Sequence, residues 1–135
     1  MKILLDTSAY VAFKRGNPHA LNRILEAEKV LFSPIVIGEL MFGFRSGTRF
    51  DKNMADLDLF LRHDSVSLQA IGKITSDRYS RIAAQLKNQG TPIPSNGIWI
   101  AAQTMENGAE LITFDQHFER VAGLVCTIFR ASQGK

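Results

Sequence analysis

A short apolar run that ends on a carboxylate constrains this chain more than any other stretch. Residues 3–5 read Ile-Leu-Leu and are followed directly by Asp6, Thr7 and Ser8. Three apolar residues are too few for a buried helix, but they are typical of a central strand in a parallel sheet. In open α/β sheets ligands bind at the carboxyl ends of such strands, which is where Asp6 would lie. The alternative is that Asp6, Thr7 or Ser8 only caps a helix that begins near Ala9.

The rest of the chain alternates between short apolar strands and amphipathic helices. Asn17 followed by Pro18 is a helix start, and so is Ser33 followed by Pro34. We expect further strands at residues 29–32, 65–68, 110–114 and 124–129. We expect helices over residues 9–14, from 18, from 34, over 50–61, over 71–90, and over 95–108 with Ser95 or Asn96 as cap. Strands separated by helices predict a single α/β domain over residues 1–135, a three-layer α/β/α sandwich around a central parallel sheet.

The composition narrows the class of protein. The chain has 135 residues, of which 45% are hydrophobic and 21% charged, as is ordinary for a globular domain with its own core. No apolar segment approaches the ~20 residues that span a bilayer. The first residues lack a secretory pattern, so we expect no membrane contact and a cytoplasmic location. The lone Cys126 can form no internal disulfide and is expected to be buried and inert. A net charge of +3 permits a polyanionic partner.

Three acidic residues stand out by their positions. Asp115 follows the expected strand at 110–114 just as Asp6 follows the first strand, so both acids would lie at the carboxyl edge of the sheet. Glu39 has only apolar or glycine neighbours three and four positions away, and a buried unpaired carboxylate costs free energy. The alternatives are that Asp115 only caps a turn at 116–118 and that Glu39 is an ordinary surface residue.

Carboxylates without accompanying cysteine or histidine ligands suit a hard divalent cation. His19, His63 and His117 show no ligand spacing, so we assign them no chemistry. Three acids that offer only oxygen ligands favour Mg²⁺ or Mn²⁺ over a structural zinc. In metal-assisted phosphodiester hydrolysis, clustered carboxylates hold such ions, which activate a water and neutralise charge on the phosphate. The acids therefore favour phosphodiester hydrolysis.

Four motifs, in their order and spacing, make the chain similar to a known family. They are Leu-Asp-Thr-Ser at 5–8, Ile-Gly-Glu-Leu at 37–40, Pro-Ile-Pro-Ser-Asn-Gly-Ile-Trp-Ile-Ala-Ala at 92–102 and Leu-Ile-Thr-Phe-Asp-Gln-His-Phe at 111–118. Over nearly its whole length the chain resembles the PIN-domain ribonucleases, specifically the VapC-like toxins of bacterial toxin and antitoxin pairs. The resemblance implies an α/β/α sandwich, bound Mg²⁺ or Mn²⁺, endonucleolytic cleavage of RNA, and neutralisation by a cognate antitoxin. It also implies a homodimer that contacts operator DNA only through the antitoxin.

The resemblance assigns roles to individual residues. Asp6, Glu39 and Asp115 match the acids that bind the metal and carry out catalysis in the family. Polar residues beside them would orient the acids or position water, and these are Thr7, Ser8, Asn96 and Thr113.

One position departs from the family pattern. Gly97 stands where the family has a catalytic aspartate. A glycine inside a helix is about 1 kcal/mol less favourable than a better helix former, so local stability does not explain it. Because the other three acids remain, we interpret Gly97 as an inactivating substitution, engineered or selected, in an otherwise active member of the family.

Two rival functions stay open on the sequence. Asp6 could be the nucleophile of a phosphatase, although the family that uses one needs a second acid at the position of Ser8. The chain could also be a non-catalytic module that holds an antitoxin and acts as a co-repressor, which the glycine at position 97 favours. The helices within 35–61 carry more apolar surface than a small domain can bury, so we expect them to form the antitoxin-binding groove.

Overall fold

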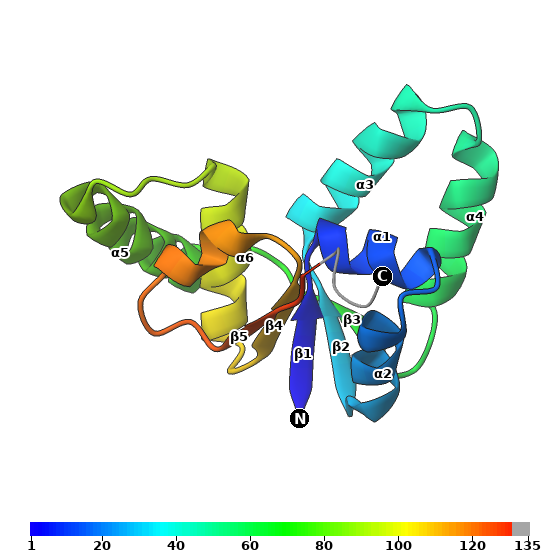
Figure 1. Cartoon of the computed structure of the whole chain (residues 1–135), viewed down its shortest axis with the longest axis horizontal. Coiled ribbons are helices and arrows are strands. Elements are labelled where there is room, and N and C mark those ends of the chain that lie inside the picture. The colour runs from blue at the N-terminus through cyan, green and yellow to red at the C-terminus, as the bar shows by residue number, and fades with distance from the viewer. Residues whose placement is uncertain (131–135) are drawn as a thin grey trace.

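Five parallel strands form one sheet at the centre of the molecule (Figure 1). The structure is a computed structural model that describes residues 1–130. The strand order is β3-β2-β1-β4-β5, so β1 is central, and Leu4 of β1 pairs with Leu31 on one side and Leu111 on the other. This sheet confirms the predicted α/β fold. The strands are β1 (Lys2–Leu5), β2 (Lys29–Phe32), β3 (Val66–Leu68), β4 (Glu110–Thr113) and β5 (Cys126–Ile128).

The helices cover both faces of the sheet. They are α1 (Thr7–Lys14), α2 (Pro18–Glu26), α3 (Pro34–Ser46), α4 (Phe50–Leu61), α5 (Lys73–Gln89) and α6 (Ser95–Glu106), followed by the 3₁₀ helix η1 (Gln116–Arg120). The chain runs outward from β1 to β2 and β3, then returns past β1 to β4. Because parallel crossovers are right-handed, this reversal places α1–α4 and the α5–α6 pair on opposite faces, as Figure 1 shows. In such sheets the ligand crevice forms where the order reverses, here between β1 and β4.

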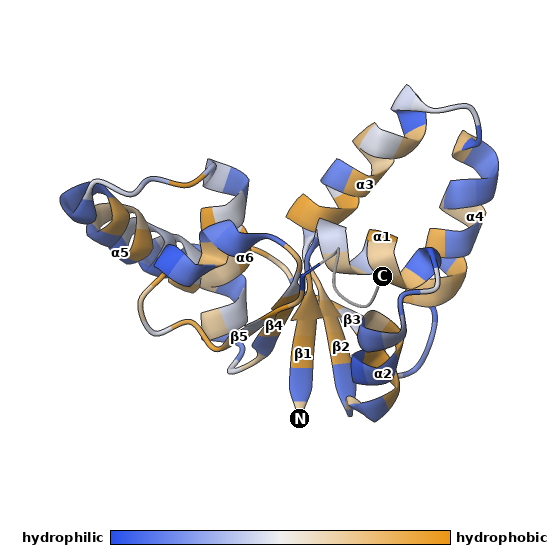
Figure 2. Ribbon diagram, viewed as in Figure 1, coloured by the Kyte–Doolittle hydropathy of each residue, from blue (hydrophilic) through white to orange (hydrophobic). Residues whose placement is uncertain are grey.

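The three inner strands supply the core. Ile3, Leu4 and Leu5 of β1 are fully buried, as are Phe32 of β2 and Leu111 of β4. Figure 2 shows β1 and β2 as apolar except where each strand begins. A strand covered by helices on both faces has no solvent side, which explains why its apolar run lacks polar alternation.

Most predicted helix and strand positions are confirmed, with a few exceptions. α6 begins after Pro94 without a side-chain cap, so the prediction that Ser95 or Asn96 caps it is wrong. β5 is shorter than the predicted strand at 124–129. Cys126 is half-buried rather than buried, although burial still raises the pKa of its thiol. In the part of the chain that the structure describes, no helix is long and apolar enough to cross a membrane.

A polar cluster fastens α2 to the amino ends of β4 and β5. Arg23 of α2 pairs with the carboxylate of Glu110, with its Nη1 3.2 Å from Glu110 Oε2. The hydroxyl of Thr127 donates a second hydrogen bond to the same carboxylate. The hydrogen bond from Arg23 is the main cause that lowers the pKa of Glu110. This ion pair is largely removed from solvent, so it is held more firmly than the exposed pairs on the helices.

We expect Arg23→Met to lower the free energy of unfolding by about 2 kcal/mol near neutral pH, because Glu110 loses a charge-assisted hydrogen bond. The folded-state pKa of Glu110 is depressed, so the stabilisation is present above the ordinary pKa of the carboxyl and is lost as the pH falls through the folded-state value. Urea unfolding across acidic to neutral pH measures both effects. Arg81→Met, which breaks an exposed pair with Asp77, is the control and should change little. A loss that stays constant into acid would contradict this assignment.

Candidate active site

Asp6 lies at the carboxyl end of the central strand, where the chain turns into α1. Its side chain is 5% exposed and accepts a hydrogen bond from the backbone N–H of Ala9 at 2.9 Å, which caps α1. The same carboxylate accepts hydrogen bonds from the hydroxyls of Ser8 and Thr113. Asp6 therefore does cap a helix, as the alternative interpretation held, but it also contacts the neighbouring strand. α1 begins at Thr7, earlier than predicted, because Asp6 is the cap.

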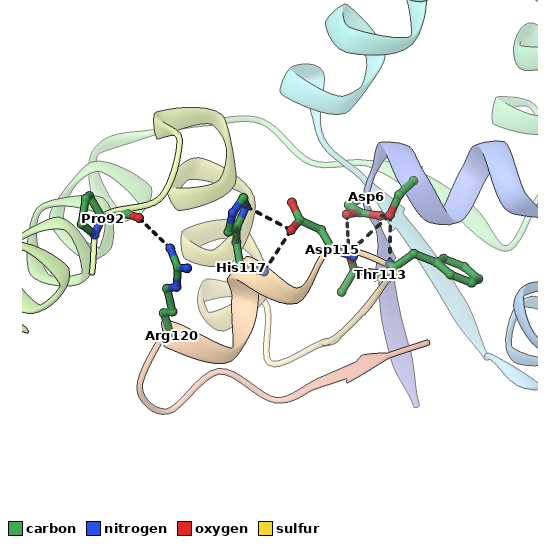
Figure 3. Close-up of polar contacts among 8 residues, drawn as sticks. Asp6, Pro92, Thr113, Asp115, His117 and Arg120 are labelled. Atoms are coloured by element: carbon green, nitrogen blue, oxygen red, sulfur yellow. Dashed lines mark hydrogen bonds and ion pairs between the residues drawn. The ribbon is translucent and has the colours of Figure 1, made fainter. Parts of the chain in front are cut away.

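Two hydroxyls join the ends of β1 and β4. Thr113 donates to Asp6 Oδ2 and accepts from the backbone N–H of Asp115 at 2.9 Å. Ser8 donates to Asp6 Oδ1 at 2.7 Å and accepts from the backbone N–H of Phe114 at 3.0 Å. Each hydroxyl thus donates to the acid and accepts from the segment that follows β4. Figure 3 shows Asp6, Thr113 and Asp115 brought together in this way.

The surroundings of Asp6 disfavour its charged form. Burial raises the pKa of Asp6 above its ordinary value, and the nearby charge of Asp115 raises it further. Hydrogen bonds from Thr113, Ser8 and Ala9 oppose this shift by stabilising the carboxylate. A positive charge placed beside Asp6 would favour its ionised form, so the electrostatics of the site suit a cationic ligand.

Glu39 reaches the same place from α3 and is held at both of its oxygens. Its Oε1 accepts a hydrogen bond from the hydroxyl of Thr7, and its Oε2 accepts one from the side-chain amide of Asn96 at 3.0 Å. Thr7 lies in the first turn of α1 and Asn96 in the first turn of α6. Three helices therefore meet around this half-buried carboxylate, and Asn96 contacts an acid instead of capping its own helix.

Asp115 follows β4, and its carboxylate is hydrogen-bonded on the side away from the strand, by η1. Its Oδ1 accepts a hydrogen bond from the backbone N–H of His117 at 2.9 Å, which caps η1, and the ring Nδ1 of His117 lies 3.1 Å from the same oxygen. Figure 3 shows the Asp115 carboxylate reaching toward His117. The sequence analysis assigned His117 no chemistry because no other histidine lies at ligand spacing. Its position two residues after a strand-end acid was the available signal.

The three acids line one pocket of about 490 Å³ at the carboxyl edge of the sheet, which we call the acid pocket. Residues from α1, α3, α6 and η1 form its walls, and no lysine or arginine is among the described residues that line it. Phe42 lies on the wall formed by α3 and is 74% exposed. The other lining residues are Thr7, Ser8, Ile93, Pro94, Asn96, Gly97, Ile100, His117 and Phe118.

Gly97 lies on the wall of the acid pocket, in the first turn of α6. A Cβ atom at this position would meet the Cδ1 methyl of Ile93 at 3.3 Å and the ring of Phe118 at 3.7 Å. Both neighbours are side-chain atoms, and the tighter one is the end of a flexible side chain. The backbone of Gly97 does not adopt a positive φ. Neither backbone conformation nor packing therefore requires glycine here.

The acids match a hard cation in donor type but not in arrangement. Mg²⁺ and Mn²⁺ prefer carboxylate oxygens, which all three acids provide. Within residues 1–130, however, no three His, Cys, Asp or Glu side chains form a group that could hold a metal ion. The carboxylates of Asp6, Glu39 and Asp115 are each bound to neighbouring protein groups instead. The side chains present therefore do not form a complete ion site, and residue 97 adds no ligand to them.

Comparison with known proteins identifies the family. The model of the PIN domain family matches residues 3–124, which is most of the chain. The chain belongs to the PIN-domain family. Its similarity to curated proteins covers more than nine-tenths of the chain.

Two curated relatives carry ribonuclease names. Ribonuclease VapC1 of Haemophilus influenzae is 25% identical over 129 residues, which cover 92% of this PIN domain and 95% of the relative. Ribonuclease VapC2 of Rickettsia felis is 28% identical over 131 residues, which cover 93% and 96%. Among solved structures, VapBC2 from Rickettsia felis bound to a promoter DNA fragment matches with a TM-score of 0.83 at 22% identity, covering 96% of this chain and 99% of that one. This last likeness supports the fold.

We expect Asp6→Asn to raise the unfolding temperature of this PIN domain by a few degrees near neutral pH. Asparagine keeps an oxygen that can cap α1 but removes a buried charge. The folded-state pKa of Asp6 is raised, so the parent loses stability as the pH rises through that value, and the gain of the variant should vanish in acid. Thermal unfolding in EDTA measures this effect.

The control for that measurement is Asp58→Asn on the exposed side of α4, which should leave the unfolding temperature unchanged. A parent protein that is more stable than Asp6→Asn at neutral pH would show that the Asp6 charge stabilises the fold.

Proposed function

We propose that this protein is a divalent-metal-dependent endoribonuclease toxin, neutralised by a cognate antitoxin, and that its present sequence is catalytically impaired at position 97. The observation that carries the proposal is that Asp6, Glu39 and Asp115 line one pocket beside the reversal point of the sheet. Relatives at 25% and 28% identity are named ribonucleases, which supports RNA as the substrate. Mg²⁺ or Mn²⁺ is the proposed cofactor because the site offers oxygen ligands.

The protein would contribute fixed oxygens whose positions do not depend on the substrate. Asp6 is held by a strand end and a helix start, and Glu39 is held by Thr7 and Asn96. Oxygens that are already held in place need not rearrange when a cation binds them. With an aspartate at position 97 as well, Asp6, Glu39 and Asp115 would hold a divalent ion, and the chemistry it would supply is charge neutralisation at a phosphate and activation of a water.

The impairment at position 97 follows from ligand number. An aspartate in the first turn of α6 would add a fourth carboxylate on the wall of the acid pocket, where Gly97 now adds none. Mg²⁺ dehydrates reluctantly and demands near-octahedral oxygen geometry, so a missing ligand weakens its binding and alters the orientation of a bound water.

We expect Gly97→Asp to restore cleavage of total RNA in the presence of Mg²⁺ or Mn²⁺, with a rate on the order of a thousandfold above that of the parent. The matched control is Gly97→Asn, which presses on Ile93 and Phe118 in the same way but adds no charge. Gel analysis with and without EDTA measures the difference. Equal, EDTA-sensitive cleavage by the parent would show that position 97 is dispensable.

The phosphatase alternative is disfavoured by the environment of Asp6. An aspartate nucleophile needs an oxygen free to attack phosphorus, but this carboxylate is buried and accepts three hydrogen bonds. Ser8 stands where the phosphatase pattern has its second acid, and it is committed to Asp6 and Phe114. The non-catalytic alternative, an antitoxin-binding co-repressor, is compatible with the glycine at position 97 and describes what the impaired chain would still do.

We place the antitoxin on the exposed apolar surface of α4. A groove of about 480 Å³ runs between α4 and α2, and Leu25 and Leu59 on its two sides are 72% and 65% exposed. Exposed apolar patches of this kind mark protein interaction sites. Asp56, Leu59 and Phe60 of this groove come from residues 35–61, where the antitoxin was expected to bind, and we extend the proposed surface to α2. We also propose that the chain forms a homodimer and reaches operator DNA only through the antitoxin. The named VapBC2 complex with promoter DNA supports the DNA role.

We expect Leu59→Asp and Leu25→Asp to reduce capture of the cognate antitoxin in a pull-down about tenfold or more, because each places a charge in an apolar contact. Both side chains are largely exposed, so the fold should not change. The control is Ile74→Asp, an equally exposed apolar residue on α5, which covers the opposite face of the sheet from α4 (Figure 1). Undiminished capture by both variants would refute this binding surface.

A further inference from the structure

The acid pocket by itself offers little that attracts an RNA strand. Asp6, Glu39 and Asp115 lie on its walls, and no lysine or arginine is among the described residues that line it. Like charges repel, so these acids alone disfavour a phosphate. Affinity for nucleic acids comes mainly from cations that meet phosphates and from aromatic rings that stack on bases. An RNA strand bound at this pocket therefore needs such groups at or beyond its rim.

Phe42 of α3 is an exposed aromatic ring on the wall of the acid pocket. It is 74% exposed, and no other phenylalanine, tyrosine or tryptophan of residues 1–130 is exposed. The other phenyl ring of the pocket, Phe118, is buried in the core. Phe42 is thus the phenyl ring that a ligand of the acid pocket can reach.

The neighbours of Phe42 on its own helix do not form an apolar patch. Residues three and four positions away share a helix face, and around Phe42 they are small, charged or polar: Gly38, Glu39, Arg45 and Ser46. Protein-binding surfaces are contiguous apolar patches, as in the groove between α2 and α4. An isolated ring between an acid and a cation suits a planar base attached to phosphates better than it suits an apolar protein segment.

Arg45 lies about one helical turn beyond Phe42 and has a free charge. Its guanidinium lies over the ring of Phe50, 4.3 Å from the ring centroid, and this contact orients the guanidinium plane. The side chain is exposed and forms no ion pair with any residue in 1–130. Guanidinium groups bind phosphates through two parallel hydrogen bonds, so Arg45 is suited to a phosphate of the backbone.

The acid, the ring and the cation follow one another along α3. Figure 1 shows α3 projecting away from the carboxyl edge of the sheet, with the turn to α4 at its far end. From Glu39 through Phe42 to Arg45 the helix axis rises by only about 9 Å, so one strand can contact all three positions. Arg49, exposed at the cap position of α4, adds a second positive charge beyond Arg45.

We propose that Phe42 stacks on one base of the RNA strand whose scissile phosphate lies in the acid pocket, and that Arg45 binds a phosphate of the same strand beyond that base. This inference rests on the proposed ribonuclease function and adds two substrate contacts to it. Stacking requires a base that is unstacked from its own neighbours, so the strand is unpaired at this nucleotide. A segment of the antitoxin is the competing occupant.

The test uses the parent chain, whose impaired cleavage permits equilibrium binding. Fluorescence anisotropy measures its affinity for a short labelled single-stranded RNA and for a series in which each nucleotide in turn is made abasic. We expect the parent to lose about tenfold in affinity at one abasic position. Phe42→Leu should bind the intact RNA about tenfold more weakly and be insensitive to the loss of that base, because leucine is apolar but has no ring. Phe42→Tyr keeps the ring and should behave as the parent does.

The phosphate contact is tested by the salt dependence of the same binding. Arg45→Gln should weaken binding of every RNA in the series and reduce the slope of log affinity against log salt by about 0.7, the value of one phosphate contact on a single strand. The matched control is Arg62→Gln, an exposed arginine at the other end of α4, which should change neither quantity. An unchanged slope for Arg45→Gln would overturn the phosphate assignment.

Two results would overturn the stacking assignment. One is equal sensitivity of Phe42→Leu and the parent to every abasic position. The other is unchanged RNA binding by Phe42→Leu together with weakened capture of the antitoxin, which would place a protein segment on this ring. Because Phe42 is largely exposed, Phe42→Leu should fold as the parent does, which its unfolding temperature checks.

Cleavage by Gly97→Asp separates this proposal from the function on which it rests. If Gly97→Asp cleaves RNA but Phe42→Leu binds as the parent does, only the stacking proposal fails. If Gly97→Asp does not cleave but the parent binds RNA through Phe42, the catalytic function fails and the binding surface stands. A parent chain that binds no RNA overturns the binding surface in either case.

Discussion

The hydrogen bond from Thr113 to the buried carboxylate of Asp6 is the interaction on which the rest of the site depends. It joins the last residue of β4 to the first residue after β1, at the point where the strand order reverses. The two strands already pair through their backbones, but backbone pairing ends where the strands end. The hydroxyls of Thr113 and Ser8 continue the connection beyond the sheet. The segments that carry Asp6 and Asp115 are therefore held in fixed positions relative to each other.

This arrangement places a buried carboxylate, whose charge destabilises the fold, on the wall of the acid pocket. A buried carboxylate destabilises a fold unless donors surround it, and Asp6 has one backbone donor and two hydroxyl donors. Those donors only partly offset burial, since the pKa of Asp6 is still raised. A residue that served only as a helix cap would lie closer to solvent and would not need Thr113. The combination of a cap and an incompletely compensated charge is typical of functional sites, where stability and activity make opposite demands.

The strands and the two strand-end acids were predictable because their signals are local. A three-residue apolar run followed by Asp6 shows both burial and position within a few residues, and the same holds for Thr113 and Asp115. Asn96 could not be assigned by local rules, because any polar residue at a helix start resembles a cap, whereas its amide in fact bonds Glu39 from another helix. The resemblance to a family placed Asn96 near the acids, but not its contact.

The contacts of Tyr10 and His117 were not predicted, for a related reason. The edge-on contacts of the Tyr10 ring with Phe32 and Phe60 depend on packing among α1, β2 and α4, which no spacing along the chain encodes. His117 contacts its acid only because η1 turns tightly after Asp115. Contacts that depend on how separate elements meet in space are therefore the ones that a single sequence conceals.

Residue 97 takes no part in the hydrogen-bond network that holds Asp6, Glu39 and Asp115. The backbone N–H of Gly97 bonds Pro94 within the first turn of α6, and no hydrogen bond of Asp6, Glu39 or Asp115 in residues 1–130 involves it. α6 keeps its position through its packing on α5 and through Ile98, Ile100 and Ala101, all buried. The strand ends and hydroxyls therefore position the three acids without help from residue 97, so a change of side chain there need not disturb them.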